Sequence, residues 1–595
     1  MCGICGIFDT ERKISPELLA RMTQIMVHRG PDAGGTWVSA DGAVGLGNRR
    51  LAIIDLDSRS NMPLHSDDGS LVITYNGEIF NFVEVRRELE SCGHRFRTNS
   101  DTEVILHGYQ EWGFDCVHKF RGMFAWALFD QPKRRLWLVR DRFGVKPLLY
   151  YQKGSTFAFA SEPQQFSQSG GFDTELDLTA LFDCLTYLYI PAPKTAFRYV
   201  RKLDAGHWMI LENGQVKIEK YWDIENFGTN VVDEATAVER LRDRLNEVIK
   251  LRLVSDVPVG VLLSGGLDSS CVTWFAQKNH RGPLQTFSIG FEEEANNELE
   301  YANEVARLVG SDHITKIYRL EAAISDSKKV KFLYGEPHGD ASIFPTTVVS
   351  RMARERVKVV LSGDGGDELF WGYPRYIEYP RFARNGVPLK SLAASAVLNV
   401  MPMLTRGRYR TLRYCTREFD LWTILMDGFL RADKWKLVCD DVRDAIRNYD
   451  DYWSYRRFWK PELPIATRLQ YLDLKTYLAD DILVKVDRAS MSVSLEAREP
   501  LLDNKLAEEV FSWPDSIRSD GKTLKYIFKK ALAGILPERI LTKRKQGFAM
   551  PWKVWIKDWE EFHSLRGDGR FFRKGVALPA NYTLLVTQKW LNEGL

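Results

Sequence analysis

The chain has little net charge, no long uncharged apolar run and few cysteines for its length. Its 82 basic and 79 acidic residues nearly cancel, which leaves a formal charge of +3 over 595 residues. An electrostatic surface for nucleic acid or for a membrane is therefore not expected. No stretch reaches the roughly 18 apolar residues that a membrane-spanning helix needs, and no signal-peptide pattern opens the sequence. Eight scattered cysteines do not resemble a disulfide framework, so we expect a cytoplasmic protein with small-molecule partners.

The length exceeds what one hydrophobic core supports. Domains usually hold about 100 to 200 residues, so 595 residues predict several domains. A hydrophobic content of 45% and a charged content of 27% are typical of globular proteins and leave little room for extended disorder.

Position 2 is the most informative position of the chain. When the initiator Met1 is removed, Cys2 becomes the N-terminal residue. Its α-amino group, with an unperturbed pKa of about 7.7 to 8.0, can then act as the base for its own thiol. We therefore expect Cys2 to be a catalytic nucleophile. The alternatives are an ordinary buried thiol and a redox or zinc pair with Cys5, for which a second ligand pair is missing.

The first half of the sequence is predicted to be a mostly antiparallel β sandwich. Short alternating or apolar runs separated by glycine turns predict strands at residues 43–46, 71–75, 124–129 and 136–139. Two helices interrupt these strands. They are expected at residues 15–27 and 82–91, where the apolar spacing is helical and the outer faces are charged.

Separated motifs in this half resemble the class II glutamine amidotransferase domain. They are Met1-Cys2-Gly3-Ile4, His28-Arg29-Gly30-Pro31-Asp32, and the segments 50–55, 75–81 and 100–103. The resemblance implies an N-terminal-nucleophile fold with two facing sheets between helix layers. It also implies that Cys2 attacks the side-chain amide of glutamine.

The residue types in these motifs suit glutamine as a substrate. The guanidinium of Arg50 can bind its α-carboxylate in a bidentate manner, and Asp101, helped by Glu78, suits its α-ammonium group. The resemblance assigns the Asn76 side chain and the Gly77 N–H to an oxyanion hole. Taken alone, Asn-Gly is the strongest signal of a hairpin turn, and Arg50 and Asp101 are typical surface charges.

The second half changes to amphipathic helices that alternate with short apolar strands, after a polar connection at residues 213–233. This alternation predicts a parallel α/β sheet with crossover helices. Residues 259–276 have the pattern of a strand, a phosphate loop and a helix, in which glycines, serines and the helix N-terminus contact phosphate. Asp268 in this loop indicates a Mg²⁺ ion between carboxylate and phosphates. The ending of a Walker A motif is absent.

The segment Ser264-Gly265-Gly266-Leu267-Asp268-Ser269-Ser270 resembles the loop of ATP pyrophosphatases, which cleave ATP between the α- and β-phosphates and adenylate a carboxyl group. Two further strands are expected at residues 286–291 and 357–361. The positions that the resemblance assigns to ATP are Leu262, Ser264, Gly265, Gly266, Asp268, Ser269, Ile289, Ser362 and Gly363.

Three more residues receive a role from this resemblance. Asp367 would join Asp268 on Mg²⁺, and Asp364 would stand at the position of a catalytic carboxylate. Lys525 matches a lysine that neutralises charge near the α-phosphate, although a lysine on an amphipathic helix is usually solvated.

Both halves together resemble glutamine-dependent asparagine synthetases over residues 1 to about 555. The implied fold is an α+β N-terminal-nucleophile (αββα sandwich) domain, residues 1–215, followed by an α/β parallel-sheet nucleotide-binding domain with extra helices, residues 216–595. The implied reaction uses glutamine, ATP with Mg²⁺ and an acceptor carboxylate, foremost aspartate. It proceeds through an acyl adenylate, with ammonia crossing an internal channel. A homodimer is expected by analogy alone.

Three departures from the family pattern concern the acceptor. Asp364 replaces Glu, bulky Trp371 replaces a small residue, and Glu499 precedes Pro500, near segments 483–492 and 495–503 that resemble the acceptor side. A nucleotide-linked uronic acid or a natural-product carboxylate is the alternative acceptor. A non-catalytic glutamine or ATP sensor and a lactam-forming synthetase are further alternatives, which the intact Cys2 disfavours.

Overall fold

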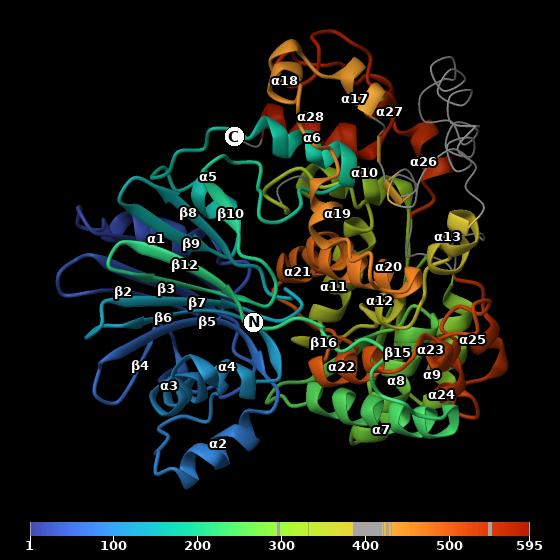
Figure 1. Cartoon of the computed structure of the whole chain (residues 1–595), viewed down its shortest axis with the longest axis horizontal. Helices are drawn as coiled ribbons and strands as arrows, with labels where there is room; N and C mark the ends of the chain where they lie inside the picture. The colour runs from blue at the N-terminus through green and yellow to red at the C-terminus, as the bar shows by residue number, and fades with distance from the viewer. Residues whose placement is uncertain are drawn as a thin grey trace.

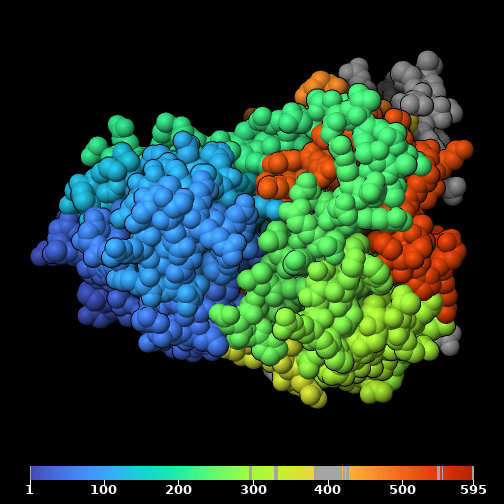
Figure 2. All heavy atoms as spheres, turned by 90° about the horizontal axis from the view of Figure 1, so that it is seen from below, coloured from blue at the N-terminus to red at the C-terminus, as the bar shows by residue number. Residues whose placement is uncertain are grey.

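The structure is a computed structural model of the whole chain. The residues that it describes are 2–293, 298–330, 333–384, 419, 422–423, 426, 428–429, 431–545 and 550–593. Met1, whose removal is expected, lies outside them. The chain forms two parts that pack against each other, a β sandwich drawn in blue to teal and a helix-covered sheet drawn in green to red (Figure 1). Figure 2 shows the same two parts in contact from below.

The first part contains two antiparallel six-stranded sheets. One has the order β10-β8-β9-β1-β3-β2 and the other β12-β11-β7-β6-β5-β4. The strands are β1 (Cys2–Asp9), β2 (Ala33–Val38), β3 (Val44–Arg50), β4 (Leu64–His65), β5 (Leu71–Ile79), β6 (Gly122–Asp130), β7 (Arg135–Arg140), β8 (Leu149–Lys153), β9 (Thr156–Ala160), β10 (Val200–Lys202), β11 (His207–Glu212) and β12 (Gln215–Lys220).

Apolar side chains of the two sheets meet in a core between them, which includes Ile4, Phe8, Leu46, Val72 and Ala127. Helix α1 (Pro16–Ile25) packs on the outer face of one sheet and α3 (Asp101–Trp112) on that of the other, with α2 (Phe82–Ser91) and α4 (Cys116–Lys119) beside α3 (Figure 1). The four layers are those of the expected αββα sandwich.

Two details differ from the sequence-based expectation. Asn76 and Gly77 lie inside β5 and pair with Ala125 and Phe124 of β6, so the hairpin-turn interpretation of Asn-Gly is wrong. The expected boundary at residue 215 coincides with the start of β12. Because β12 pairs with β11, the sheet of the first part continues to Lys220.

The second part is built on a parallel sheet with the order β15-β14-β13-β16-β17. Its strands are β13 (Val259–Leu262), β14 (Gln285–Phe291), β15 (Asp312–Tyr318), β16 (Val359–Leu361) and β17 (Glu496–Arg498). Helices α8 (Leu267–Asn279) and α9 (Leu299–Val309) contact β13 and β14 respectively. Helix α11 (Ile343–Arg354) contacts β14 and β15, and α21 (Leu483–Met491) contacts β17 and α11. Both faces of the sheet are therefore buried, as is usual for parallel sheets.

Many further helices surround these two frameworks (Figure 1). They are α5 (Gln164–Ser167), α6 (Leu178–Tyr187), α7 (Glu234–Arg252), α10 (Leu320–Val330), α12 (Gly366–Leu369), α13 (Arg375–Arg384), α17 (Arg431–Leu437), α18 (Asp440–Ala445), α19 (Trp453–Phe458), α20 (Ile465–Asp473), α22 (Asn504–Ser512), α23 (Asp515–Arg518), α24 (Tyr526–Leu532), α25 (Glu538–Thr542), α26 (Trp552–Asp558), α27 (Glu560–His563) and α28 (Tyr582–Glu593), with a π-helical segment at Leu474–Ile482 and short 3₁₀ turns at Ser58–Ser60 and Gly113–Asp115. Within the described ranges, none of these helices combines the length and apolar character needed to cross a membrane.

Candidate functional site

Cys2 is the first residue of β1, where it is 6% exposed and pairs with Arg50 of β3. Burial raises the pKa of its thiol, since a thiolate is poorly solvated there. Cys5 follows at an odd spacing along the same strand. The two thiols therefore point to opposite faces of the sheet, and Cys5 contacts Thr23 at 3.4 Å between Sγ and Oγ1. The interpretation of Cys2 and Cys5 as a redox or zinc pair is wrong.

Asn76 contacts Cys2 directly. The backbone N–H of Cys2 donates to Asn76 Oδ1 at 2.9 Å, whereas the buried Asn76 Nδ2 has no hydrogen-bond partner in the described structure. A Cβ atom at Gly77 would lie 2.2 Å from the Met123 carbonyl oxygen, so only glycine permits this pairing with β6. An unpaired amide donor beside a cysteine is chemically suited to an oxyanion that forms on that cysteine.

Two buried carboxylates, Glu78 near the end of β5 and Asp101 on α3, interact electrostatically. Asp101, at the start of α3, accepts hydrogen bonds from the Tyr75 hydroxyl at 2.8 Å and from the Ile79 N–H at 2.9 Å. Glu78 Oε2 is buried without a partner among the described residues. Burial raises the pKa of both Glu78 and Asp101, and repulsion from Glu496 and then from Asp101 adds to the shift at Glu78. An ammonium group bound here would relieve that repulsion.

Arg50 lies beside Cys2, but its guanidinium is largely occupied by the loop that follows β3. Nη1 donates to the Asp57 carbonyl at 3.0 Å and to Asn61 Oδ1 at 2.9 Å, and Nη2 donates to the carbonyls of Ile54 and Asp55. Each terminal nitrogen has two N–H groups, so the expected bidentate contact with a carboxylate requires this loop to release Arg50.

The expected phosphate loop follows β13 and leads into α8. Ser264 Oγ lies 3.0 Å from Ser269 Oγ and accepts a hydrogen bond from the Gly266 N–H at 3.3 Å. Gly265 has φ +69°, and a Cβ atom there would lie 2.5 Å from the Ala302 nitrogen of α9. The loop is therefore closed by its own serines and pressed against α9, which leaves the N-terminus of α8 facing the cavity.

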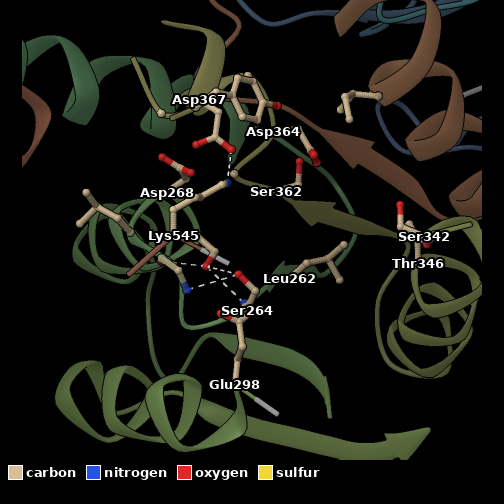
Figure 3. Close-up of a pocket in the computed structure, with 18 of the residues that line it drawn as sticks. Leu262, Ser264, Asp268, Glu298, Ser342, Thr346, Ser362, Asp364, Asp367 and Lys545 are labelled. Atoms are coloured by element: carbon tan, nitrogen blue, oxygen red, sulfur yellow. Dashed lines mark hydrogen bonds and ion pairs between the residues drawn. The ribbon is translucent and has the colours of Figure 1, made fainter. Parts of the chain in front are cut away.

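Asp268 and Asp367 lie near each other at the carboxyl edge of the parallel sheet (Figure 3), and Lys525 forms an ion pair with both. Lys525 Nζ binds Asp268 Oδ2 and lies 2.7 Å from Asp367 Oδ1, and Lys545 also binds Asp367. Burial raises the pKa of Asp268. At Asp367 burial acts in the same direction, but the ammonium groups of Lys525 and Lys545 lower its pKa overall.

These two carboxylates suit Mg²⁺ bound together with phosphates. Among the described residues there is no group of three or more His, Cys, Asp or Glu side chains that could hold a metal alone. Mg²⁺ commonly uses one or two carboxylates plus substrate phosphates and water, and Asp268 and Asp367 provide that number beside the loop.

A cavity of about 1340 Å³ is lined by most of the residues that were expected to bind ATP and Mg²⁺. Its lining includes Leu262, Ser264, Gly266, Asp268, Ser269, Ile289, Ser362, Gly363, Asp364, Asp367 and Lys525. Gly265 is the one expected ATP residue that does not line it. Figure 3 shows Leu262, Ser264 and Glu298 on one side, and Thr346 of α11 with Ser342, the residue before that helix, on another.

Several lining residues were not expected from the sequence. They are Asp340, Glu368, Tyr373, Tyr477, Lys485 and the basic run Lys543-Arg544-Lys545. Glu368 and Lys485 fall within segments that resemble the family. The sequence therefore pointed to these segments but assigned no function to the two residues. Asp340 and Tyr477 lie outside the motif segments, and only the folded chain brings them to the cavity.

Of the three departures near the acceptor, only Asp364 lines the cavity. Trp371 is buried in an aromatic cluster that includes Tyr187, Tyr376 and Trp422, so its expected place at the acceptor pocket is not seen. Glu499 is also buried, and its Oε2 has no partner among the described residues.

A buried cysteine beside an unpaired amide donor, in one chain with a glycine- and serine-rich loop beside an aspartate pair, fits an ATP-dependent ligase fused to a glutamine amidotransferase. A family model described as a glutamine amidotransferase domain matches residues 1–222, and one described as asparagine synthase matches residues 240–568. The chain belongs to the glutamine-hydrolysing asparagine synthetase family. It is an ATP-dependent carbon–nitrogen ligase with glutamine as the amido donor.

Individual relatives cover nearly the whole chain. Glutamine-hydrolyzing asparagine synthetase 1 of Bacillus subtilis is 34% identical over 94% of this chain and 88% of its own length. A putative glutamine-hydrolyzing asparagine synthetase of Mycobacterium tuberculosis is 33% identical, with the same coverage. Amidase chry2 of Gibberella zeae is 26% identical over 93% of this chain and 90% of its own length.

Proposed function

We propose that the protein converts L-aspartate, L-glutamine, ATP and water into L-asparagine, L-glutamate, AMP and pyrophosphate. The observation that carries this proposal is the meeting of Asp268, Asp367 and Lys525 beside a phosphate loop, in a chain that also has a buried Cys2 with a free amide donor. The first cluster suits adenylation and the second suits amide hydrolysis.

Glutamine is hydrolysed at Cys2. The thiol adds to the amide carbonyl, and the α-amino group that removal of Met1 exposes carries the thiol proton to the leaving nitrogen, so ammonia departs. Asn76 Nδ2 and the Gly77 N–H stabilise the oxyanion of each tetrahedral intermediate. Water then cleaves the thioester and gives glutamate, while Glu78 and Asp101 hold the α-ammonium group of the substrate.

The acceptor is activated at the second cluster. Its carboxylate oxygen attacks the α-phosphorus of ATP, the bond to the β-phosphate breaks, and pyrophosphate leaves. Asp268 and Asp367 would hold Mg²⁺, which neutralises phosphate charge. Lys525 binds the same phosphates, and the serines and glycines of residues 264–269 orient them. Ammonia attacks the acyl carbon, AMP departs and one proton is released.

The test is pyrophosphate release from the purified protein with glutamine and MgATP, with and without aspartate. The proposal requires aspartate-dependent pyrophosphate with an equal amount of asparagine. Glutamine hydrolysis without aspartate-dependent pyrophosphate would exclude aspartate and leave the glutaminase assignment in place.

A second acceptor class is a hydroxyl-rich carboxylate such as a nucleotide-linked uronic acid. Asp340, Asp364 and Glu368 line the cavity together with Lys485. Burial opposes the charge of Lys485, yet Asp340 and Asp364 raise its pKa. Aspartate brings two carboxylates to this acidic lining, whereas a sugar acid brings one carboxylate and several hydroxyl donors. Pyrophosphate release with uronic acids in place of aspartate tests this candidate.

A further inference from the structure

An arginine of the first part joins the nucleophile to a helix of the second part. Arg29 is fully buried. Its Nε donates to the carbonyl oxygen of Cys2 at 3.1 Å. Its terminal nitrogens form a bidentate pair with Asp487 of α21, at 2.8 Å from Nη1 to Oδ2 and 2.9 Å from Nη2 to Oδ1. Bidentate pairs of this kind fix orientation as well as distance.

The neighbouring residue of α21 holds the same strand by a second route. Arg488 Nη1 lies 2.7 Å from Glu162 Oε1, which also binds Arg29 at 2.8 Å. Arg488 Nη2 donates to the Ser161 carbonyl at 3.0 Å, and Ser161 Oγ accepts from the Ile4 N–H of β1 at 3.0 Å. Two consecutive residues of α21 therefore anchor the strand that begins with Cys2.

Helix α21 also reaches the other site. Lys485 and Val486, just before Asp487, line the cavity that contains the aspartate pair, as does Ile482. Four consecutive residues of α21 thus reach both places: Lys485 and Val486 line the cavity, and Asp487 and Arg488 hold the residues that contact the strand of Cys2. The contact between α21 and the strand of Cys2 is an ion-pair network: Asp487 and Glu162 face Arg29 and Arg488 with little exposure to solvent, and His28 Nε2 lies 3.1 Å from Glu162 Oε2.

We propose that Asp487 is a positioning residue for glutamine hydrolysis: it fixes Arg29, which fixes the backbone of Cys2 against Asn76. The glutaminase centre is then complete only when α21 of the second part is docked on it. This inference rests on the proposed role of Cys2 as the nucleophile. Asp487 does not line the cavity of the second part, and its hydrogen bonds go to Arg29, so its loss is expected to act on Cys2 through Arg29.

The decisive variant is Asp487→Asn in the full-length protein, which keeps volume and removes the charge. We expect kcat/KM for glutamine hydrolysis to fall about tenfold or more, mainly through kcat, because small displacements of a nucleophile are costly. Ammonia-dependent pyrophosphate release should stay within about twofold of wild type, since acceptor and ATP contacts are unchanged. Asp487→Glu, which keeps the charge, should recover part of the loss.

Asp503→Asn is a matched control. Asp503 is equally buried and also accepts an arginine of the first part, Arg121, with 2.9 Å between Nη2 and Oδ1. Its partners do not include Cys2 or Arg29. Asp503→Asn should therefore weaken the contact between the two parts without a selective loss of glutamine hydrolysis.

Two results would overturn the inference. One is an equal loss of glutamine-dependent and ammonia-dependent activity in Asp487→Asn and Asp503→Asn, which would mean that Asp487 only stabilises the interface. The other is unchanged glutamine hydrolysis in Asp487→Asn. Failure of the proposed function has a different signature, because wild type would then hydrolyse no glutamine or Cys2→Ala would hydrolyse it normally.

Discussion

Asn76 binds the backbone N–H of Cys2 with its side-chain oxygen, 2.9 Å away, while its side-chain nitrogen stays unpaired in the described structure. The oxygen fixes the orientation of the amide group. The nitrogen thereby stays available as a hydrogen-bond donor beside Cys2. If Cys2 is the nucleophile, as proposed, this one asparagine would both position it and donate to the oxyanion.

Replacing Asn76 by Ala should therefore slow glutamine hydrolysis by about 10² to 10³-fold in kcat, the usual cost of losing one oxyanion donor. Ammonia-dependent synthesis should remain, because it bypasses this site. Steady-state glutaminase and ammonia-dependent pyrophosphate assays measure the two activities. Cys2→Ala is the reference for complete loss of hydrolysis, and an Asn76→Ala variant with normal kcat would contradict the assignment.

Lys525 forms an ion pair with both Asp268 and Asp367, so its ammonium group offsets the repulsion between the two carboxylates. Replacing it by Met should abolish pyrophosphate release while glutamine hydrolysis continues, since the two chemistries use separate sites. The variant also leaves the buried Asp268 without its ammonium partner, whereas Asp367 keeps its ion pair with Lys545, and an unpaired buried carboxylate is destabilising. Mg²⁺ can then replace the lost charge.

Thermal unfolding with and without Mg²⁺ checks this argument. Mg²⁺ should raise the apparent midpoint more in Lys525→Met than in wild type, because a ligand of the folded state stabilises it by mass action. Lys529→Met removes another lysine of the cavity lining that has no ion pair with either aspartate, and it serves as the control. Equal responses to Mg²⁺ in all three proteins would exclude the aspartate pair as the magnesium site.

Glu499 should make stability depend on pH. Burial raises its pKa to about 8, with Lys146 opposing the shift and Asp364 adding to it. An unfolded glutamate ionises near about 4.3, so above that pH the unfolded state binds fewer protons than the folded state. The stabilising contribution is complete below the unfolded pKa and is lost as pH rises to about 8, with a slope of up to about 1.4 kcal/mol per pH unit.

Glu499→Gln removes this titration. The difference in apparent melting temperature between Glu499→Gln and wild type should therefore grow in favour of the variant from about pH 5 to pH 8, then level off. Exposed Glu239→Gln on α7 is the surface control and should follow wild type. Parallel curves for wild type and Glu499→Gln would contradict the neutral, buried form of Glu499.

Local sequence patterns predicted most of the helices and strands that build the two parts. Helix α2 begins and ends where apolar spacing placed it, and β13 with its loop was readable because a buried strand, glycines and a helix start follow one another. The Asn76-Gly77 pair was open to interpretation as a hairpin turn, because its position inside β5 depends on pairing with β6, which is about 50 residues away in sequence. Nothing in the local sequence distinguished Lys485 or Asp487, because their contacts form only when distant parts of the chain pack together.

The last prediction concerns Trp371. It was expected at the acceptor pocket because the family pattern has a small residue at this position. It is 6% exposed within the aromatic cluster and has φ +59°. Trp371→Gly should relieve the left-handed backbone by about 1 kcal/mol but lose packing worth about 3 to 5 kcal/mol, so the apparent melting temperature should fall. The ratio of kcat/KM between aspartate and a uronic acid should stay within about twofold, because the side chain does not line the cavity. If Trp371→Gly reversed the preference between aspartate and the uronic acid and left the melting temperature unchanged, Trp371 would have to contact the acceptor.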